Sequence, residues 1–399
     1  MRFWLVATMT GSLLGLAGPA AAACNLSAPD ASHAGGVPCI QPWLDANMRI
    51  NQLQFVGTAE SYKLAPSDAL LSLIRMGGKK DAEALDFAEP PLADQLNDGA
   101  RSLEFDVAYD PKGGQFKNPA GASMASELLD PDYVGAMSKP GFKVIHVLDV
   151  DFHSSCTALK DCLAEVAAWS RMHKDHPPIL IALHANDAKT PMPGATQPLP
   201  FDANAFEDLD AEIRSVFQAN ELITPDQIKG AHADLREAVQ AGAWPTLGEA
   251  RGKVIFLLDD KAEKTDLYTG PAKSLQGRPM FVATDEQSPL AAFICVDDPI
   301  KDQARIAADV ESGFIVKTRA DADTREARGN KTARRDAAFA SGAQIVATNF
   351  LMPDKKIGDY QVTLATASDD AVQCDAKLPG RQCVSWAARP PRVIAAAAH

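Results

Sequence analysis

Short apolar runs that end in a polar or charged residue recur along the chain. They are rich in Val, Ile, Leu and Phe. Runs of this kind are typical of parallel strands that are buried on both faces of a sheet. We therefore predict eight strands, over residues 53–58, 102–109, 143–149, 179–184, 253–259, 291–296, 313–318 and 343–348.

Helical patterns lie between these strands. The clearest covers 157–172, where apolar residues recur near positions i, i+3 and i+4. Strands that alternate with helices predict an α/β fold, a single-domain (β/α)8 TIM-like barrel. A doubly wound sheet is the alternative, which the lack of a G-x-G-x-x-G or P-loop motif after any strand disfavours. The other predicted helices cover 130–137, 204–219, 235–241, 301–312 and 327–340.

The N-terminus has the features of a cleaved export signal. Arg2 precedes an apolar stretch over 3–17, and an A-x-A pattern ends directly before Cys24. We predict a signal peptide over 1–23 and an exported protein, either periplasmic or secreted. A lipoprotein signal acylated on Cys24 is the alternative. The mature chain, 24–399, is predicted to be the barrel domain with N- and C-terminal extensions, and no later stretch is apolar for long enough to cross a membrane.

Predicted export places the seven cysteines in an oxidising compartment. Spacing alone does not fix connectivity. Cys295 lies inside an apolar run and is expected to be a buried free thiol. No C-x-x-C pair is present, which argues against structural zinc. The three close pairs in the sequence are Cys24/Cys39, Cys156/Cys162 and Cys374/Cys383.

The balance of charge excludes one class of function. Lys and Arg number 39 and Asp and Glu number 52, so the formal net charge is 39 − 52 = −13. A surface of this sign repels the phosphates of nucleic acids, and we expect no nucleic-acid partner. A net charge of −13 still allows a local basic site for one phosphate, or an acidic site for a cation.

Chemistry in such barrels lies at the C-terminal ends of the strands, and nearly every predicted strand here ends in an ionisable or polar residue. Glu104 and Asp106 stand two apart on one strand and should both point into the barrel mouth. Two close carboxylates repel each other unless a cation or a proton lies between them, which favours a hard divalent cation such as Ca²⁺. A salt bridge with Lys317 or Arg319 is the alternative.

Two further pairs are expected at the mouth. Lys317 and Arg319 are also two apart on one strand, and an Arg fork beside a Lys charge is suited to hold a phosphate. Their alternative role is to neutralise the acidic pair. His146 and His184 close two neighbouring predicted strands, and two imidazoles that face one mouth favour acid–base chemistry. The histidines predicted to lie on the surface are His153, His173 and His176.

Several stretches of the chain resemble one enzyme family. The run Gln-Phe-Val-Gly-Thr-Ala-Glu-Ser-Tyr at 54–62 is similar to the G-T-H-N-S-Y motif of phosphatidylinositol-specific phospholipase C. Residues 86–106 are similar to the stretch that leads to that family's E-x-D calcium ligands. The resemblance is to the bacterial calcium-dependent phosphoinositide phospholipase C group, and it covers most of the chain. It continues in the family's order through 140–149, 244–259, 316–323 and 341–349.

This resemblance implies a TIM-like barrel that cleaves a phosphodiester. In the family the inositol 2-hydroxyl attacks the phosphorus and gives a cyclic phosphate and diacylglycerol, while calcium polarises the phosphate and lowers the pKa of that hydroxyl. It further implies that His146 is a general acid or base and that Glu104 and Asp106 are two calcium ligands. Lys317 and Arg319 fit the basic positions that hold the substrate.

Three family positions differ in this chain. Ala59 replaces the first catalytic His, Glu60 replaces an Asn that binds calcium, and His184 replaces a Glu that binds calcium. We therefore predict a metal site made of Glu60, Glu104, Asp106 and His184. Three carboxylates and an imidazole suit Zn²⁺, Mn²⁺ or Fe²⁺ better than Ca²⁺. In a regular strand Glu60 would point to the side opposite Ala59, away from the reacting groups.

Two functions compete on this basis. The first is an exported metal-dependent phosphodiesterase that cleaves a phosphoinositide-like substrate, with His146 as general acid or base and a transient contact with a membrane surface. The second is a catalytically impaired member that binds inositol phosphates or lipid head groups through Lys317 and Arg319; a structural or partner-binding barrel is a third. Because Ala59 has no acid–base capacity, we expect weak cleavage of phosphatidylinositol, reduced about 10² to 10⁴ in rate.

Overall fold

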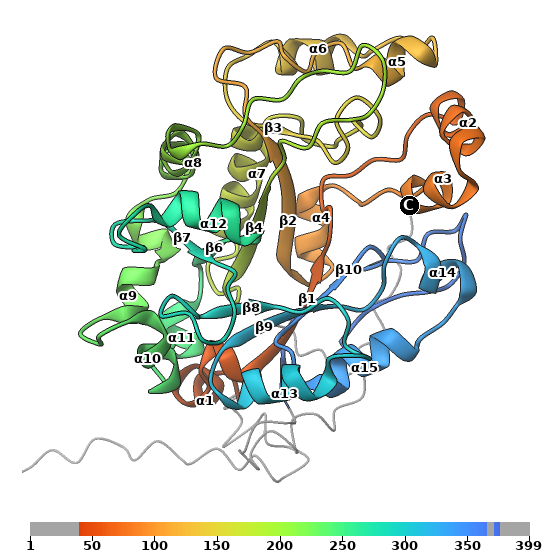
Figure 1. The fold of residues 1–399 in the computed structure, drawn as a ribbon. Helices are drawn as coiled ribbons and strands as arrows, with labels where there is room; N and C mark the ends of the chain where they lie inside the picture. Colours follow the sequence, from red (N-terminus) through yellow and green to blue (C-terminus); the bar gives the residue numbers. More distant parts are fainter. Residues whose placement is uncertain (1–39, 365–370, 376–399) are drawn as a thin grey trace, which may run out of the picture.

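Eight parallel strands form a closed ring in the computed structural model, which describes residues 40–364 and 371–375 (Figure 1). Around the ring the order is β1-β2-β4-β6-β7-β8-β9-β10, and β10 pairs with β1 again. The chain is therefore the α/β barrel that its hydrophobic pattern predicts. The ring strands are β1 (Leu53–Thr58), β2 (Ala100–Ala108), β4 (Ile179–Ala185), β6 (Val254–Leu258), β7 (Met280–Val282), β8 (Phe293–Cys295), β9 (Ile315–Arg319) and β10 (Ile345–Thr348).

The ring has its fewest backbone pairings between β7 and β8. A further short strand, β5 (Leu222–Ile223), pairs with the first half of β6, while β7 pairs with the second half. β7 and β8 are linked in the described chain by the single bridge between Ala283 and Phe293. Two short strands therefore share the edge of β6 that one long strand would occupy.

Seven of the eight predicted strands belong to the ring, and the strand predicted over 143–149 is wrong. The strand found there is β3 (Lys143–Val144), which runs antiparallel to the end of β2 and lies outside the ring. The missed ring strand is β7, whose three apolar residues are too few for a pattern that needs about four to eight. The rest of 143–149 is an irregular loop.

Helices connect the strands and cover the outside of the ring (Figure 1). In α7 (Leu159–Met172) the buried residues Leu159, Leu163 and Val166 recur at helical spacing, so one side of the helix packs on the barrel. The helix predicted over 327–340 is interrupted, because Asn330 adopts a left-handed conformation after α14. The other helices are α1 (Ile40–Asn47), α2 (Asp68–Gly77), α3 (Lys79–Leu85), α4 (Leu92–Asn97), α5 (Ala120–Met124), α6 (Pro131–Met137), α8 (Ala203–Val216), α9 (Pro225–Lys229), α10 (Leu235–Gln240), α11 (Leu247–Ala250), α12 (Ala262–Thr269), α13 (Gln303–Glu311), α14 (Arg325–Gly329) and α15 (Ala333–Ser341), with short 3-10 helices at Ile50–Gln52 and Ala219–Glu221.

The barrel is apolar until its strands reach their C-terminal ends. β4 over 179–183 and β6 over 254–258 consist of Ile, Leu, Val, Ala and Phe, all of them buried. Burying one large side chain of this kind contributes about 1.5–3 kcal/mol to stability. Parallel strands bring all their carboxyl ends to one mouth, so the polar residues that close or follow the strands gather there.

One of the three close cysteine pairs lies wholly within the described residues, and it forms a disulfide. Cys156 and Cys162 are bonded, with their Cα atoms 5.4 Å apart. Cys295 is a free thiol, as expected, but it is only partly buried. Cys374 is also disulfide-bonded and lies in β11 (Gln373–Cys374), which pairs with the start of β1. Among the described helices, none is long and apolar enough to span a membrane. The predicted signal peptide and three cysteines lie outside the described residues: Cys24, Cys39 and Cys383.

Candidate active site

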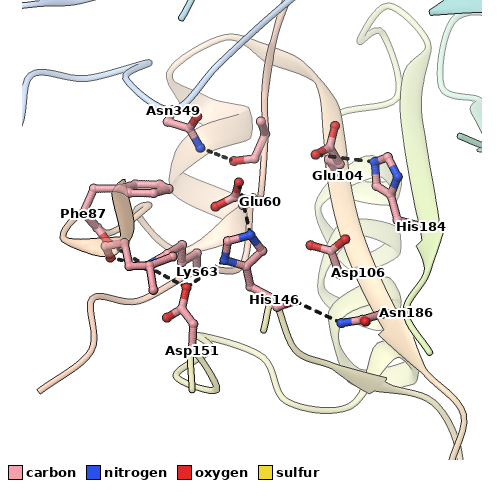
Figure 2. A network of polar contacts seen from close by, with 12 residues as sticks. Glu60, Lys63, Phe87, Glu104, Asp106, His146, Asp151, His184, Asn186 and Asn349 are labelled. Carbon is pink, nitrogen blue, oxygen red and sulfur yellow. Dashed lines mark hydrogen bonds and ion pairs between the residues drawn. The ribbon is translucent and has the colours of Figure 1, made fainter. Parts of the chain in front are cut away.

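β2 provides the acidic wall of the mouth, and β4 places His184 beside it. Glu104 and Asp106 lie two apart on β2 and both point to the mouth, as the sequence predicts, and Asp106 is in register with His184 of β4 (Figure 2). The Tyr62 hydroxyl donates a 2.6 Å hydrogen bond to Asp106 Oδ2 and fixes that carboxylate. His184 Nε2 lies 3.5 Å from Glu104 Oε1. The two carboxylates therefore have different partners.

Lys317 reaches this wall from β9. Its Nζ donates a hydrogen bond to Glu104 and another, of 2.7 Å, to Oδ2 of Asp259, the residue that follows β6. Burial alone would raise the pKa of Glu104, but the charges of Lys317 and His184 outweigh it and hold that pKa well below its ordinary value. The sequence left open a salt bridge from Lys317 to Glu104 or Asp106. This salt bridge is present, and its acidic partner is Glu104.

His184 is held in its charged form. Burial would lower the pKa of its imidazole, but the neighbouring carboxylates of Glu104 and Asp259 outweigh burial and raise this pKa to about 10. A metal-binding imidazole has to give up its proton. In the arrangement described here His184 is therefore an ion-pair partner of Glu104 and a cationic group of the mouth.

His146 reaches the mouth from the loop that follows β3. Asn186 Nδ2 anchors this loop to the end of β4, because it donates to the carbonyl oxygens of Ile145 (2.8 Å) and His146 (3.0 Å). His146 Nδ1 donates to Asp151 Oδ2 at 2.7 Å, and His146 Nε2 lies 3.6 Å from Glu60 Oε1 (Figure 2). Burial would lower the pKa of His146, but Glu60 and Asp151 raise it to about 9. The imidazole is therefore cationic at neutral pH.

A buried lysine stands behind Asp151. Lys63 Nζ lies 3.3 Å from Asp151 Oδ2 and donates to the carbonyl oxygens of Leu85 (2.7 Å) and Phe87 (3.2 Å). The side chains of Lys63 and Asp151 are fully buried. Neither residue was predicted from the sequence to belong to the site. Asp151 follows His146 within an irregular loop, where spacing carries no information about which side chains meet.

Glu60 enters the mouth because the chain leaves β1 through a left-handed turn. The φ angle of Glu60 is 52°, which is uncommon for a residue other than glycine, and its carbonyl accepts a 2.8 Å hydrogen bond from the backbone N–H of Lys63. The side chain therefore faces His146 and does not point away as a regular strand would require. Its Oε2 is buried without a hydrogen-bond partner in the described chain, and burial raises the pKa of Glu60.

Arg319 lies at the end of β9, two residues after Lys317. Its Nη2 donates to Asn349 Oδ1 at 2.7 Å, and Asn349 Nδ2 donates to the carbonyl oxygen of Ala59 at 3.2 Å. These contacts join the ends of β9, β10 and β1. Arg319 Nε is buried and has no hydrogen-bond partner within the described residues. The guanidinium is thus fixed in place, and one of its five donors is unused within the described residues.

A cavity of about 500 Å³ opens beside the mouth, a volume that suits a small polar head group. His184, Lys317 and Arg319 are among the residues that line it. Six lining carboxylates outnumber its two permanently basic side chains, so the cavity as a whole is acidic. These carboxylates belong to Glu104, Asp259, Asp260, Asp266, Asp285 and Asp297.

The site residues predicted from the sequence all lie at this mouth: Glu60, Glu104, Asp106, His146, His184, Lys317 and Arg319. They form two groups, one around Glu104 and one around His146, with Asp106 between them (Figure 2). Asp259 completes the first group and Asp151 the second. The catalytic and ligand roles of these residues stay predictions.

One of the histidines predicted to lie on the surface is buried. His176 Nε2 accepts a 2.6 Å hydrogen bond from the Ser170 hydroxyl, and His176 Nδ1 donates a 2.5 Å hydrogen bond to the carbonyl oxygen of Pro177. Burial lowers the pKa of His176 to about 4. The surface prediction is wrong because the chain after α7 folds back over Trp169, whose ring packs against the imidazole.

Calcium does not fit the mouth as it stands. The ligand atoms of Glu104, His184 and Asp259 lie within 4.8 Å of one another, so these residues could hold a metal ion. Calcium takes about six to eight oxygen ligands, whereas one of these three donors is an imidazole nitrogen. Both carboxylates also accept hydrogen bonds from Lys317, whose ammonium lies between them. The predicted four-residue metal site stays a prediction.

Comparison with protein families gives one match. A family model described as phosphoinositide phospholipase C, Ca²⁺-dependent, matches residues 48–375 of the chain. No curated protein matches the chain.

Solved structures similar to this chain come from several bacteria. A calcium-dependent phosphoinositol-specific phospholipase C from the Gram-negative Pseudomonas sp, in a myoinositol complex, is 16% identical, with a TM-score of 0.49 and with 84% of this chain and 97% of that chain covered. A Ca²⁺-dependent phosphatidylinositol-specific phospholipase C from Streptomyces antibioticus is 17% identical (TM-score 0.48; 76% and 95% covered). A mutant phosphatidylinositol-specific phospholipase C from Staphylococcus aureus is 10% identical (TM-score 0.42; 80% and 94% covered).

Proposed function

Because the chain belongs to the Ca²⁺-dependent phosphoinositide phospholipase C family, whose model matches residues 48–375, we propose that it is a phosphodiesterase of the phospholipase C type. The observation that carries the proposal is the cationic imidazole of His146, flanked by Asp151 and Glu60 at a mouth that also holds the basic side chains Lys317 and Arg319. A proton donor beside a phosphate-binding wall supports cleavage of a phosphodiester.

In the proposed step a hydroxyl of the head group attacks the phosphorus while the bond from phosphorus to the glycerol oxygen breaks. His146 gives its Nε2 proton to the leaving glycerol oxygen. Asp106 accepts the proton of the attacking hydroxyl. The products are a cyclic phosphodiester and diacylglycerol, so protons and charge balance. Exchange of protons with water returns both side chains to their starting state.

Asp106, and not Glu60, is assigned as the base. Attack and departure are in line, so acid and base have to reach oxygens on opposite sides of the phosphorus. Glu60 Oε1 and His146 Nε2 are 3.6 Å apart and would serve the same side. Asp106 lies between His146 and His184, and burial raises the pKa of Asp106 toward the range of a useful base (Figure 2). Glu60 instead helps to keep His146 protonated.

Three cationic groups would hold the phosphoryl oxygens. Arg319 keeps an unused Nε–H, Lys317 lies beside it on β9, and His184 is charged because of Glu104. Their positions are fixed by contacts with other residues before a substrate arrives. Preorganised donors of this kind stabilise the charge that develops on the phosphoryl oxygens in the transition state.

An inositol-like head group would occupy the cavity of about 500 Å³, and the lipid would be presented by a membrane surface. The strongly exposed side chains of Met124 and Leu128 support transient contact with such a surface, since α5 lies on the side of the barrel where β2 ends (Figure 1). Export is part of the proposal. It is supported by the sequence of 1–23 and by the disulfide between Cys156 and Cys162, which is typical of an oxidising compartment.

Product analysis tests the proposed activity. The mature chain is incubated with phosphatidylinositol in detergent micelles, and ³¹P NMR follows the water-soluble products. The expected result is a cyclic inositol phosphate.

Ala59, which has no acid–base group where the family has His, favours head-group binding as a second candidate function. The protein could instead bind phosphatidylinositol vesicles saturably and release no product from them or from an aryl inositol phosphodiester. Head-group binding would then replace phosphodiester cleavage as the function.

A further inference from the structure

We propose that the ammonium group of Lys317 is the resident cation of the mouth, in the position between Glu104 and Asp259, and that the site works without a bound divalent ion. The binding part of this inference concerns the folded protein alone. Its catalytic part rests on the proposed phosphodiesterase function.

The ammonium group of Lys317 lies between two carboxylates. Lys317 extends from β9 and donates to carboxylates from two other parts of the ring, Glu104 on β2 and Asp259 at the end of β6. The side chain of Lys317 is 6% exposed and that of Glu104 is 10% exposed. The side chain of Lys317 is therefore buried and cannot move into solvent freely. It is a buried charge whose place is set by two carboxylates.

A divalent ion at this position would have to displace Lys317. Glu104 and Asp259 provide both carboxylates of the group that could hold a metal, and both already accept hydrogen bonds from Lys317. A divalent ion bound by these two carboxylates would separate them from the Lys317 ammonium, whose side chain is only 6% exposed. Leaving a buried charge without its partners is strongly unfavourable.

The remaining ligands do not suit calcium. The third member of the group is His184, and imidazole is a poor ligand for calcium. The two other residues of the predicted metal site have partners elsewhere in the mouth. Glu60 pairs with His146, and Asp106 accepts a hydrogen bond from Tyr62. Within the described residues, neither Glu60 nor Asp106 belongs to the group whose ligand atoms lie within 4.8 Å of one another, and that group offers two carboxylates and one imidazole. Calcium takes about six to eight oxygen ligands.

Lys317 can also supply the positive charge that a metal ion would contribute to cleavage. An ammonium group has three N–H donors, and the hydrogen bonds to Glu104 and Asp259 use two of them. The third is available to a phosphoryl oxygen of a substrate in the adjoining cavity, which Lys317 lines. The positive charge that stabilises the transition state then comes from the chain itself.

Metal titrations of the mature chain test this inference. The protein is treated with EDTA, dialysed, and titrated with CaCl₂ or MnCl₂ by calorimetry and by thermal unfolding. Three variants are compared with the wild type. Lys317→Met removes the ammonium at similar volume and leaves Glu104, His184 and Asp259 open to a metal. Lys317→Arg keeps a cation, and Lys264→Met removes a lysine that pairs with Asp187 outside the group.

We expect the wild type, Lys317→Arg and Lys264→Met to show no stoichiometric binding of either ion and a change in Tm below about 1 °C. Lys317→Met should gain Mn²⁺ binding, and Mn²⁺ should raise its Tm by several degrees. Stoichiometric calcium binding by the wild type overturns the inference, whether or not Lys317→Met folds. A gain of binding by Lys264→Met equal to that of Lys317→Met also overturns it.

The same samples separate this inference from the proposed function. Cleavage of phosphatidylinositol that continues in EDTA supports both. If the wild type binds no metal and cleaves no phosphodiester under any condition, the inference about Lys317 is supported and the proposed function is wrong. If cleavage begins only when calcium is added, the proposed function is supported and the inference about Lys317 is wrong.

Discussion

The Nδ1 atom of His146 lies 2.7 Å from Oδ2 of Asp151, and this same carboxylate oxygen lies 3.3 Å from Nζ of the buried Lys63. One oxygen thus orients the imidazole and is itself held by a lysine that is tied to the loop after α3. The Nδ1–H bond to Asp151 leaves Nε2 of His146 as the atom that faces the mouth. This pairing makes the acid–base role of His146 open to direct tests.

Replacing Asp151 by Asn keeps a hydrogen-bond acceptor for His146 Nδ1 but removes a negative charge. Glu60 and Asp151 hold the pKa of His146 at about 9, so losing one of them should lower this pKa by roughly one to two units. A general acid works only while it is protonated, so the rate falls as the pH rises through its pKa. The alkaline limb of the profile of kcat/KM against pH should therefore move from about 9 to lower pH.

Glu127→Gln is the matched control for Asp151→Asn. Glu127 accepts a 2.6 Å hydrogen bond from the imidazole of His153, so it forms the same kind of pair outside the site. This variant should keep the alkaline limb of the wild type. An alkaline limb that stays in place in Asp151→Asn would mean that His146 is not the acid.

Lys63→Met should destabilise the fold. The side chains of Lys63 and Asp151 are both fully buried, and removing one member of such an ion pair costs about 3–5 kcal/mol. Urea titrations give the free energy of unfolding. Lys79→Met removes a lysine from an exposed pair with Glu83 on α3 and should stay close to the wild type. If Lys63→Met were as stable as Lys79→Met, the buried pair would not hold the site together.

The hydrophobic pattern predicted the barrel because the central strands are long and apolar. β4 and β6 are buried on both faces, and such runs stand out in a sequence. β7 escaped prediction because it has three residues, and it is held by pairing with β6 and not by its own pattern. The loop after β3 was mistaken for a ring strand because Val, Ile and Leu in 143–149 have the same composition as a buried strand.

The site could be predicted only as far as local geometry determines it. Glu104 and Asp106 face one mouth because residues two apart on a strand share a face. The partners of Lys317 depend on contacts across the ring, 213 residues away at Glu104 and 58 residues away at Asp259. The position of Glu60 depends on a φ angle of 52° that its residue type does not favour.

His176 should make stability depend on pH. Its pKa in the folded protein is lowered to about 4, whereas an unfolded chain has a value near 6.5. The unfolded state therefore takes up a proton first, and the contribution of neutral His176, present above about pH 6.5, is lost as the pH falls through about 4. The loss amounts to roughly 3 kcal/mol.

Unfolding measured for the wild type and for His176→Gln between about pH 7 and pH 4 isolates this effect. The advantage of the wild type over His176→Gln should shrink as the pH falls, because Gln does not titrate. A difference between wild type and His176→Gln that is independent of pH would rule out the buried neutral imidazole.

The acidic cavity should select against highly charged head groups. Six carboxylates line it against Lys317 and Arg319, so additional phosphates on the head group would meet like charges. We expect kcat/KM for phosphatidylinositol to exceed that for its 4,5-bisphosphate by about tenfold or more, with a smaller difference at high salt. Equal values at low salt would show that the head group does not enter this cavity.

The most direct test of the account is kcat/KM for phosphatidylinositol in His146→Gln compared with His153→Gln. Both variants remove an imidazole that pairs with a carboxylate, at Asp151 and at Glu127, but the account gives a chemical role to His146 alone. We predict that His146→Gln loses about 10² to 10⁴ in kcat/KM, while His153→Gln stays within a few-fold of the wild type. Equal rates in the two variants would contradict the account.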